Sequence, residues 1–359
     1  MRITRSAAVL ASLVVLVATQ ASAQSSIRQA REEAQRAYRR ALAEARAVYQ
    51  GRNRGPEQSD TLSRKVRIGR TGQVTVQNIS GEITVSAGSG DEATIDAVKR
   101  GRADRSELGR VNIVVEEHPG RVDVRTEYGR PGFPDRLFRD SNVSVDYTIV
   151  VPDGASVDLK SISGSIRLTG VKGSVRLQTI SGNVTSTGAP RVEFAKTVSG
   201  AVDLSGVSFD GDLSASSISG SLHANGVKAR SVDISTVSGD VVLRDAACER
   251  VNARSISGSI EYNGALARNG RYEVNSHSGG VRFTLTGNIG FELDASSFSG
   301  SVRSDYPLTV GGDRNPNIQL GRGRGRRFGP GSELQASFGD GSARLMLRTF
   351  SGDVVIAKK

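Results

Sequence analysis

Apolar and polar residues alternate along most of this chain, and the alternation recurs at a fixed interval. Residues 157–168, with the sequence VDLKSISGSIRL, show one complete copy. Apolar residues at alternate positions, rich in valine and isoleucine, are typical of β-strands. The pattern therefore predicts two short strands in each copy, separated by a Ser-Gly pair.

The Ser-Gly pair marks the centre of every copy and reveals the period. Between residues 164 and 300 the glycines follow one another at gaps of 18, 18, 20, 19, 19, 21 and 21 residues. A constant period in this range indicates a repeat architecture. The ten glycines, which we predict to be structural corners, are Gly81, Gly164, Gly182, Gly200, Gly220, Gly239, Gly258, Gly279, Gly300 and Gly352.

The alternation changes parity once in each copy, just ahead of the glycine. Val157 and Leu159 share one parity, whereas Ile162 shares the other with Ile166 and Leu168. Because side chains in a strand alternate with a period of two, such a change requires a bend. Glycine permits backbone angles closed to other residues at this corner. A Ser or Thr three residues earlier, such as Thr179, can bond the backbone there.

About 19 residues with two strands and a short third side would form one coil of a β-solenoid, with coils stacked about 4.8 Å apart. We therefore predict an all-β, single-stranded β-solenoid of about 18–21 residues per coil, preceded by an N-terminal helix. The alternative is a β-sandwich of antiparallel hairpins. The nearly constant period favours the solenoid.

Residues 1–23 have the pattern of a secretory signal peptide. Arg2 and Arg5 precede an apolar stretch at 7–18, and Ala21-Ser22-Ala23 is typical of a cleavage site. We expect export to the periplasm, the cell surface or the extracellular medium, with no transmembrane helix after cleavage. An uncleaved membrane anchor is the alternative.

The rest of the chain divides into three parts. Residues 24–61 are predicted to form a helix at 25–51 and a linker; the helix is a spacer, a self-association element or a basic surface helix. Residues 62–151 are predicted to form an N-terminal β cap, with a hairpin around His118-Pro119-Gly120. Residues 152–359 contain the regular repeats, interrupted by a basic loop at 304–333 and closed by strands at 343–348 and 353–357.

Charge gives the first indication of a partner. The chain has 48 Lys and Arg against 37 Asp and Glu, a formal net charge of +11. Outside the cell, this charge favours anionic envelope glycans or surface polymers. Nucleic acid is not expected because the chain is predicted to be exported. The possible contacts with an anionic partner are Arg322, Arg324, Arg326 and Arg327.

The sequence contains no recognisable catalytic, metal-binding or cofactor-binding motif. His118, His223 and His277 lie far apart and begin no metal-ligand spacing. The single cysteine, Cys248, excludes an internal disulfide and is expected to be a buried small residue, or else a thiol that pairs between chains. Asp158, Asp233, Glu273 and Asp294 occupy equivalent outward positions, but Arg176, Ser214 and Asn252 share that position in other copies.

The repeat resembles that of the bacterial candidate-adhesin family, a β-strand-repeat domain without an assigned function. The resemblance covers roughly residues 62–357 and depends on motifs such as Thr197-Val198-Ser199-Gly200 and Thr349-Phe350-Ser351-Gly352. It implies an exported, non-enzymatic β-solenoid that acts as an envelope or cell-surface binding scaffold. The alternatives are a polysaccharide-processing β-helix enzyme and an envelope-stress sensor or partner protein.

Overall fold

The protein is all-β throughout the part that its computed structural model describes, as predicted. The described residues are 58–101, 108–129, 143–310, 326–328 and 332–359, all within one unit that spans 57–359. The predicted signal peptide at 1–23 and the predicted helix at 25–51 lie outside them. Within the described ranges, no helix is long and apolar enough to cross a membrane.

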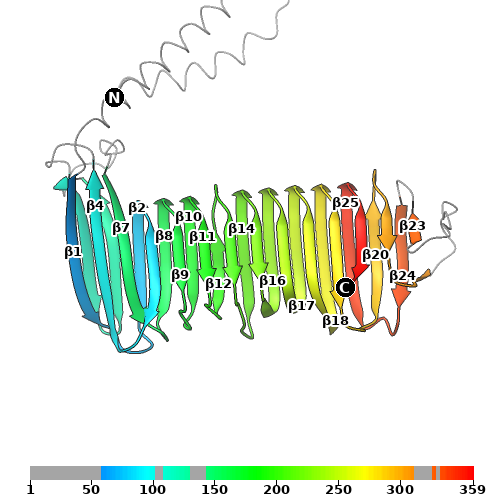
Figure 1. Cartoon of the computed structure of the whole chain (residues 1–359), viewed down its shortest axis with the longest axis horizontal. Helices are drawn as coiled ribbons and strands as arrows, with labels where there is room; N and C mark the ends of the chain where they lie inside the picture. The colour runs from blue at the N-terminus through cyan, green and yellow to red at the C-terminus, as the bar shows by residue number, and fades with distance from the viewer. Residues whose placement is uncertain (1–57, 102–107, 130–142, 311–325, 329–331) are drawn as a thin grey trace, which may run out of the picture. The chain divides into compact units, whose positions relative to one another are not determined.

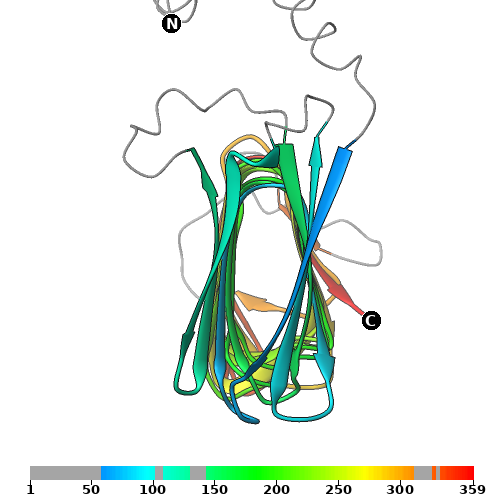
Figure 2. The ribbon, with the colours of Figure 1, turned by 90° about the vertical axis from the view of Figure 1, so that its left-hand side faces the viewer.

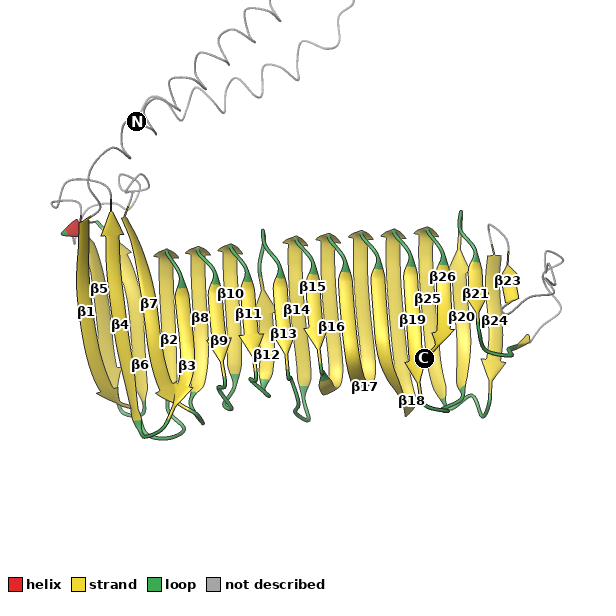
Figure 3. Cartoon of the chain, in the orientation of Figure 1, coloured by secondary structure: helices red, strands yellow, loops and turns green. Residues whose placement is uncertain are grey.

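Twenty-six strands form one mostly parallel sheet that curls until it is nearly closed around a narrow interior (Figures 1, 2 and 3). We call its two long sides wall A and wall B. In spatial order, wall A contains β5 (Val111–His118), β6 (Arg121–Tyr128), β2 (Gln73–Ser80), β8 (Ser156–Ser163), β10 (Val175–Ser181), β12 (Val192–Lys196), β14 (Asp212–Ser219), β16 (Lys228–Ser238), the second halves of β17 (Val241–Ser257) and β18 (Ile260–Ser278), β25 (Ala343–Ser351), β20 (Phe291–Ser297), β24 (Ser332–Phe338) and β22 (Thr309–Val310).

Wall B faces wall A across the interior. In the same order it contains β1 (Gln58–Arg67), β4 (Glu92–Gly101), β7 (Val143–Pro152), β3 (Ile83–Gly88), β9 (Ile166–Thr169), β11 (Val184–Thr187), β13 (Val202–Ser205), β15 (Leu222–Asn225), the first halves of β17 and β18, β19 (Val281–Thr286), β26 (Val354–Lys358), β21 (Val302–Ser304) and β23 (Arg326–Phe328).

Successive repeats stack directly on one another, one turn of chain per repeat. In wall A, Leu177 of β10 pairs with Leu159 of β8, and in wall B, Val184 of β11 pairs with Ile166 of β9. Equivalent positions therefore form straight rows along the stack. A short third side also pairs in parallel where Lys228, Ala247 and Ala265 lie in register.

The interior of the stack is filled by rows of small branched side chains, which widen into an aromatic cluster in the longer coils. Leu159, Leu177 and Val184 are fully buried in coils of 18 residues. The 21-residue coil that follows Gly258 instead buries Tyr262 and Tyr272, and Tyr262 stacks on Phe283 with ring centroids 4.7 Å apart. A longer coil encloses a wider interior, which aromatic rings fill.

The corner glycines lie directly on one another. The amide of Gly182 donates to the carbonyl of Ser199 in the next coil, and a Cβ atom on Gly182 would overlap the carbonyl oxygen of Gly164. The φ angle of Gly182 is also +145°, a region that L side chains rarely adopt. The close backbone approach requires glycine at this corner in every copy, and the positive φ adds to it in all copies but those of Gly164 and Gly300.

Hydroxyl groups inside the corner join each coil to the one before it. In eight copies the Ser or Thr three residues before the glycine points inward and donates to a corner glycine carbonyl at 2.8–3.2 Å, whereas the inward hydroxyl of Ser161 has no hydrogen-bond partner. The donors are Thr179, Thr197, Ser217, Thr236, Ser255, Ser276, Ser297 and Thr349. These bonds confirm the predicted role of the hydroxyl at this position.

The apolar residue two before the glycine faces solvent, which corrects its grouping with the interior residues that follow the corner. Ser161 continues the inward phase of Val157 and Leu159, so Ile162 points outward from the end of the same strand. The backbone bends after Ile162, and Ile166 is then buried in wall B. The change of parity is real, but it brings the apolar side chain to the surface.

The N-terminal end of the stack is closed by antiparallel strands. β5 and β6 form the predicted hairpin, while β4 pairs antiparallel with β1 and β7. β1 begins at Gln58, ahead of the predicted start of the domain at residue 62. The coil formed by β2 and β3 lies between the β6–β7 coil and the β8–β9 coil, so the chain folds back over its own first coil.

The C-terminal strands do not close the stack, contrary to the prediction. β25 pairs with β18 on one side and β20 on the other, and β26 lies between β19 and β21. The Gly352 coil is therefore inserted between the Gly279 and Gly300 coils (Figure 1). Antiparallel strands β22, β23 and β24 cap this end, so part of the predicted loop at 304–333 is β-structure.

Glycine stacking predicts a difference between two Gly→Ala substitutions. Gly188 has φ +64° and nothing near its missing Cβ, so Gly188→Ala should cost about 1–2 kcal/mol of unfolding free energy from backbone strain alone. Gly239→Ala adds overlap with the Gly220 carbonyl and should cost at least twice as much. Equal losses in chemical denaturation would contradict the stacking argument.

Buried tyrosines should make the stack lose stability in alkali. Burial raises the pKa of both Tyr147 and Tyr272 to about 12, against about 10 in an unfolded chain. The stabilisation is complete below pH 10 and is lost as pH rises towards 12, by about 2–3 kcal/mol for each tyrosine. Between pH 10 and pH 12, the Tyr147→Phe variant should lose less unfolding free energy than the wild type, as measured by chemical denaturation at each pH. An unchanged slope, or tyrosine ionisation near pH 10 in the folded protein, would refute the prediction.

Candidate binding surface

A continuous apolar row runs along the corner edge of the stack. It consists of the ten side chains two residues before each corner glycine, and we call it the corner ridge. In spatial order its members are Ile79, Ile162, Ile180, Val198, Ile218, Val237, Ile256, His277, Phe350 and Phe298. Nine steps of about 4.8 Å give the ridge a length of about 43 Å.

Solvent reaches this ridge although its members are among the most apolar residues of the chain. Ile162 is 48% exposed, Ile256 is 54% exposed and Phe298 is 66% exposed. Neighbours in the row cover one another, which accounts for the rest of their surface. Covering the exposed half of one isoleucine would contribute roughly 1 kcal/mol to the free energy of binding. A partner that covers the whole ridge would therefore gain several times this amount. A straight apolar strip of this kind marks an interaction site.

One end of the ridge is aromatic. The rings of Phe298 and Phe350 stack with centroids 4.7 Å apart and planes 6° apart, and His277 stacks on the other face of Phe350 at 5.0 Å. His277 occupies an apolar position in the repeat, and the structure places it as an exposed ring in this stack. The ridge thus changes from aliphatic to aromatic along its length.

Two polar rows border the ridge in wall A. The serine of each Ser-Gly pair, such as Ser181 or Ser257, is exposed directly beside it. On the other side, two residues before each ridge member, lies a row with four basic and no acidic residues: Gln77, Lys160, Gln178, Lys196, Ser216, Ser235, Arg254, Asn275, Arg348 and Ser296. We call it the basic row.

The outward carboxylates lie farther from the ridge than the basic row. Asp158 accepts an ion pair from Lys160 at 3.2 Å, and Asp294 from Arg348 at 3.3 Å. Asp233 and Glu273 are separated by the coil of Asn252, and Arg176 lies beside Asp158. No two of the four predicted acids occupy adjacent coils. The registers therefore place the acids singly along the wall.

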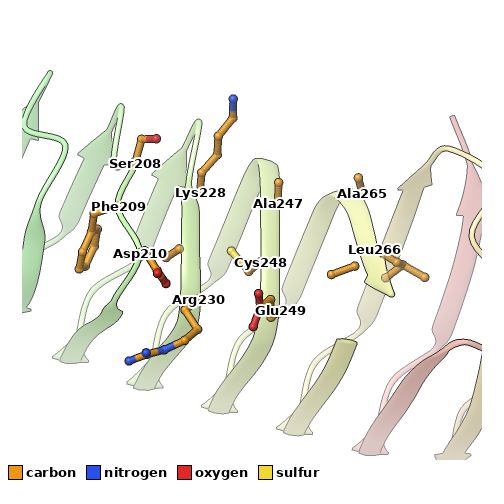
Figure 4. Close-up of a pocket in the computed structure, with 12 residues that line it drawn as sticks. Ser208, Phe209, Asp210, Lys228, Arg230, Ala247, Cys248, Glu249, Ala265 and Leu266 are labelled. Carbon is orange, nitrogen blue, oxygen red and sulfur yellow. The ribbon is translucent and has the colours of Figure 1, made fainter. Parts of the chain in front are cut away.

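The third side of the coils holds a shallow hollow (Figure 4). It is lined by Phe209, Lys228, Arg230 and Glu249, while Cys248 lies at its base. Cys248 is only 2% exposed, and burial raises the pKa of its thiol. The expectation of a buried small residue is confirmed. Arg230 is engaged by Asp212 at 3.1 Å.

The remaining sequence candidates are dispersed. His223 contacts Asp203 at 2.9 Å in wall B, and His118 lies 3.9 Å from Asp123 in the N-terminal cap. In the described part of the chain, no cluster of three or more His, Cys, Asp or Glu side chains could hold a metal ion. Arg322 and Arg324 lie outside the described residues. Arg326 and Arg327 belong to β23, where Arg327 pairs with Arg303 of β21.

The fold and the exposed ridge define an all-β repeat protein whose recognisable surface is an edge rather than a cleft. The family profile described as Toastrack DUF4097 matches residues 70–327, which is more than half of the chain. The chain therefore belongs to the Toastrack DUF4097 family, consistent with the resemblance drawn from its Ser-Gly motifs.

Several solved structures are similar to this chain at low sequence identity. A candidate cell adhesion protein from Clostridium sporogenes is 10% identical, with 84% of this chain and 100% of that chain covered and a TM-score of 0.22. A candidate adhesin from Bacteroides fragilis is 10% identical over 84% and 97%, with a TM-score of 0.38. A candidate lipid-binding protein from Parabacteroides distasonis is 12% identical over 63% and 90%, with a TM-score of 0.36. No curated protein matches the chain.

Burial predicts that the single thiol is unreactive in the folded protein. Cys248 should react with a thiol-specific disulfide reagent at least a hundred times more slowly in the native state than in denaturant, because the reactive thiolate is both scarce and covered. The kinetics can be followed by absorbance. Rapid native reaction, or a disulfide-linked dimer under mild oxidation, would contradict this burial.

Proposed function

We propose that the protein is an exported, non-enzymatic, adhesin-like scaffold that binds a component of the cell envelope or cell surface through its corner ridge. The observation that carries this proposal is the row of ten aligned side chains at the corner edge, nine of which are apolar and most of which are exposed. The signal-peptide pattern and the net charge of +11 support an envelope location and an anionic partner.

A rigid stack suits this function. Each ridge member is held by the strand before it and the glycine corner after it. The ridge residues therefore lose little conformational entropy when a partner binds. The serine row beside it supplies hydrogen-bonding groups along the whole length. Such an edge would contact an extended surface at many equivalent points rather than enclose a small molecule.

A polysaccharide-processing enzyme is the second candidate, and the outward acids test it. Asp233 and Glu273 lie two coils apart, about 10 Å along the wall. Inverting glycosidases separate their carboxyl groups by about 6.5–9.5 Å, with the substrate between them. We favour the scaffold because the register leaves each acid without an acidic neighbour, on a wall rather than in a cleft. Release of oligosaccharides from acidic glycans, abolished by Asp233→Asn, would favour the enzyme.

Binding to envelope fractions provides the test of the scaffold. The protein purified after export should bind envelope fractions or whole cells at physiological salt. The triple variant Ile180→Ser, Ile218→Ser, Ile256→Ser should bind about a hundredfold more weakly, because three half-exposed side chains contribute roughly 3 kcal/mol.

Val150→Ser, Val242→Ser, Val355→Ser is the matched control, since these valines are partly exposed on wall B. It removes the same number of apolar side chains and should bind like the wild type. Both variants should retain the wild-type circular dichroism spectrum. Absence of binding by the wild-type protein, or equal losses in the two variants, would refute the proposal.

A further inference from the structure

We infer that the corner ridge and the basic row together form a docking edge for an anionic lipid bilayer. This inference rests on the scaffold proposed above and names its partner class. Three features of the described residues support it: the straightness of the apolar row, the sign of the charges beside it, and the aromatic end.

The shape of the ridge fits a planar partner. The members follow one another in register along about 43 Å, at the edge where the chain passes from wall A to wall B. The two walls enclose a narrow interior (Figure 2). A flat surface can contact all ten side chains at once. Side chains of this size would enter the boundary between headgroups and acyl chains, as the apolar faces of interfacial helices do.

The charged residues two positions before the ridge members are positive, while the equivalent of the ridge position in β6 is Glu127, which is paired with Arg125 at 2.7 Å. Lys196 and Arg254 form no ion pair with any described residue, and both belong to the basic row, two positions before the ridge in their strands. Lys160 and Arg348 are paired with acids that lie on the side away from the ridge. Cations at this position would meet lipid phosphates when the ridge inserts, with each contributing about fivefold to affinity near an anionic surface.

The aromatic end fits the same partner. Phe298, Phe350 and His277 present exposed rings at one end of the ridge. Phenylalanine is among the side chains that interfacial helices bury at the boundary of headgroups and acyl chains. In this arrangement Ser299 and Ser351 lie beside the rings and would face the headgroups. The far end of the ridge is aliphatic, so the two ends would enter the interface with different side chains.

A second copy of the chain fits the ridge less well. In a two-fold pair with antiparallel stacks, burying ridge on ridge would bring both basic rows to the same side of the contact. Repulsion between Lys196, Arg254 and their counterparts would then oppose the apolar gain. An anionic bilayer satisfies the apolar row and the basic row together.

Fluorescence tests insertion directly because the chain contains no tryptophan. Ile218→Trp places a single tryptophan on the ridge, and Asn225→Trp places one on wall B of the same coil. With vesicles of equal parts phosphatidylglycerol and phosphatidylcholine, Ile218→Trp should shift its emission to shorter wavelength and be quenched by brominated acyl chains. Asn225→Trp should do neither. Equal behaviour of the two tryptophans would overturn the inference.

Charge variants test the role of the basic row. Lys196→Gln with Arg254→Gln should bind these vesicles about thirtyfold more weakly at low salt. Arg244→Gln with Arg282→Gln removes the same charge from exposed positions of wall B and should change binding by less than threefold. Vesicles of phosphatidylcholine alone should bind weakly. Equal losses in the two double variants would show attraction by net charge alone and would overturn the inference.

The two proposals fail in different ways. Ridge-dependent binding to envelope fractions without binding to the phosphatidylglycerol vesicles would overturn the lipid inference and leave the scaffold standing. If the protein binds neither the envelope fractions nor the vesicles, the scaffold proposal and the lipid inference are both refuted. A wild-type dimer in sedimentation that becomes monomeric in the ridge triple variant would assign the ridge to a second copy and overturn the lipid inference.

Discussion

The direct contact of one corner glycine with the next sets the geometry on which the rest of the structure depends. Because Gly182 has no Cβ, its backbone can lie against the Gly164 carbonyl, and the coils approach to the spacing that strand pairing requires. The inward hydroxyl of Thr179 then bonds the same carbonyl, which leaves the preceding corner satisfied inside a dry core. Ile180 follows the inward Thr179 in the same strand and therefore points outward, just before the corner. The steric constraint thus sets the stacking, and strand alternation places the apolar edge beside it.

Much of the fold follows from the sequence, because the repeat period records the number of residues in each coil. The period, the corner glycines and the role of Thr179 could all be predicted from positions that recur. The position of the Gly352 coil in the stack could not be predicted. Its Ser-Gly motif is the same as that of the other corners and does not specify which coil it stacks on. The strands β22 and β24 could not be predicted either, because they pair antiparallel and lie outside the repeat pattern.

The binding surface was only half visible in the sequence. The apolar residue before Ser-Gly was recognised, but its parity matched that of the interior residues after the corner, and parity alone cannot say where the chain bends. The hydroxyl at Thr197 carried the missing signal: a buried polar group that continues the inward phase places Val198 outside. The basic row depends on registers between strands 18 or more residues apart, which become apparent once the coils are stacked.

The insertion of the last coil has a consequence for how the molecule is made. A ribosome delivers residues 291–338 before 343–358, yet β20 and β21 lie against β25 and β26 rather than against β18 and β19. Growth from the N-terminus can therefore add coils in order only as far as β19. The strands β20 and β21 must wait for residues 343–358, or first occupy the wrong neighbour and be displaced. The appearance of β25 and β26 thus becomes the event that seals the stack.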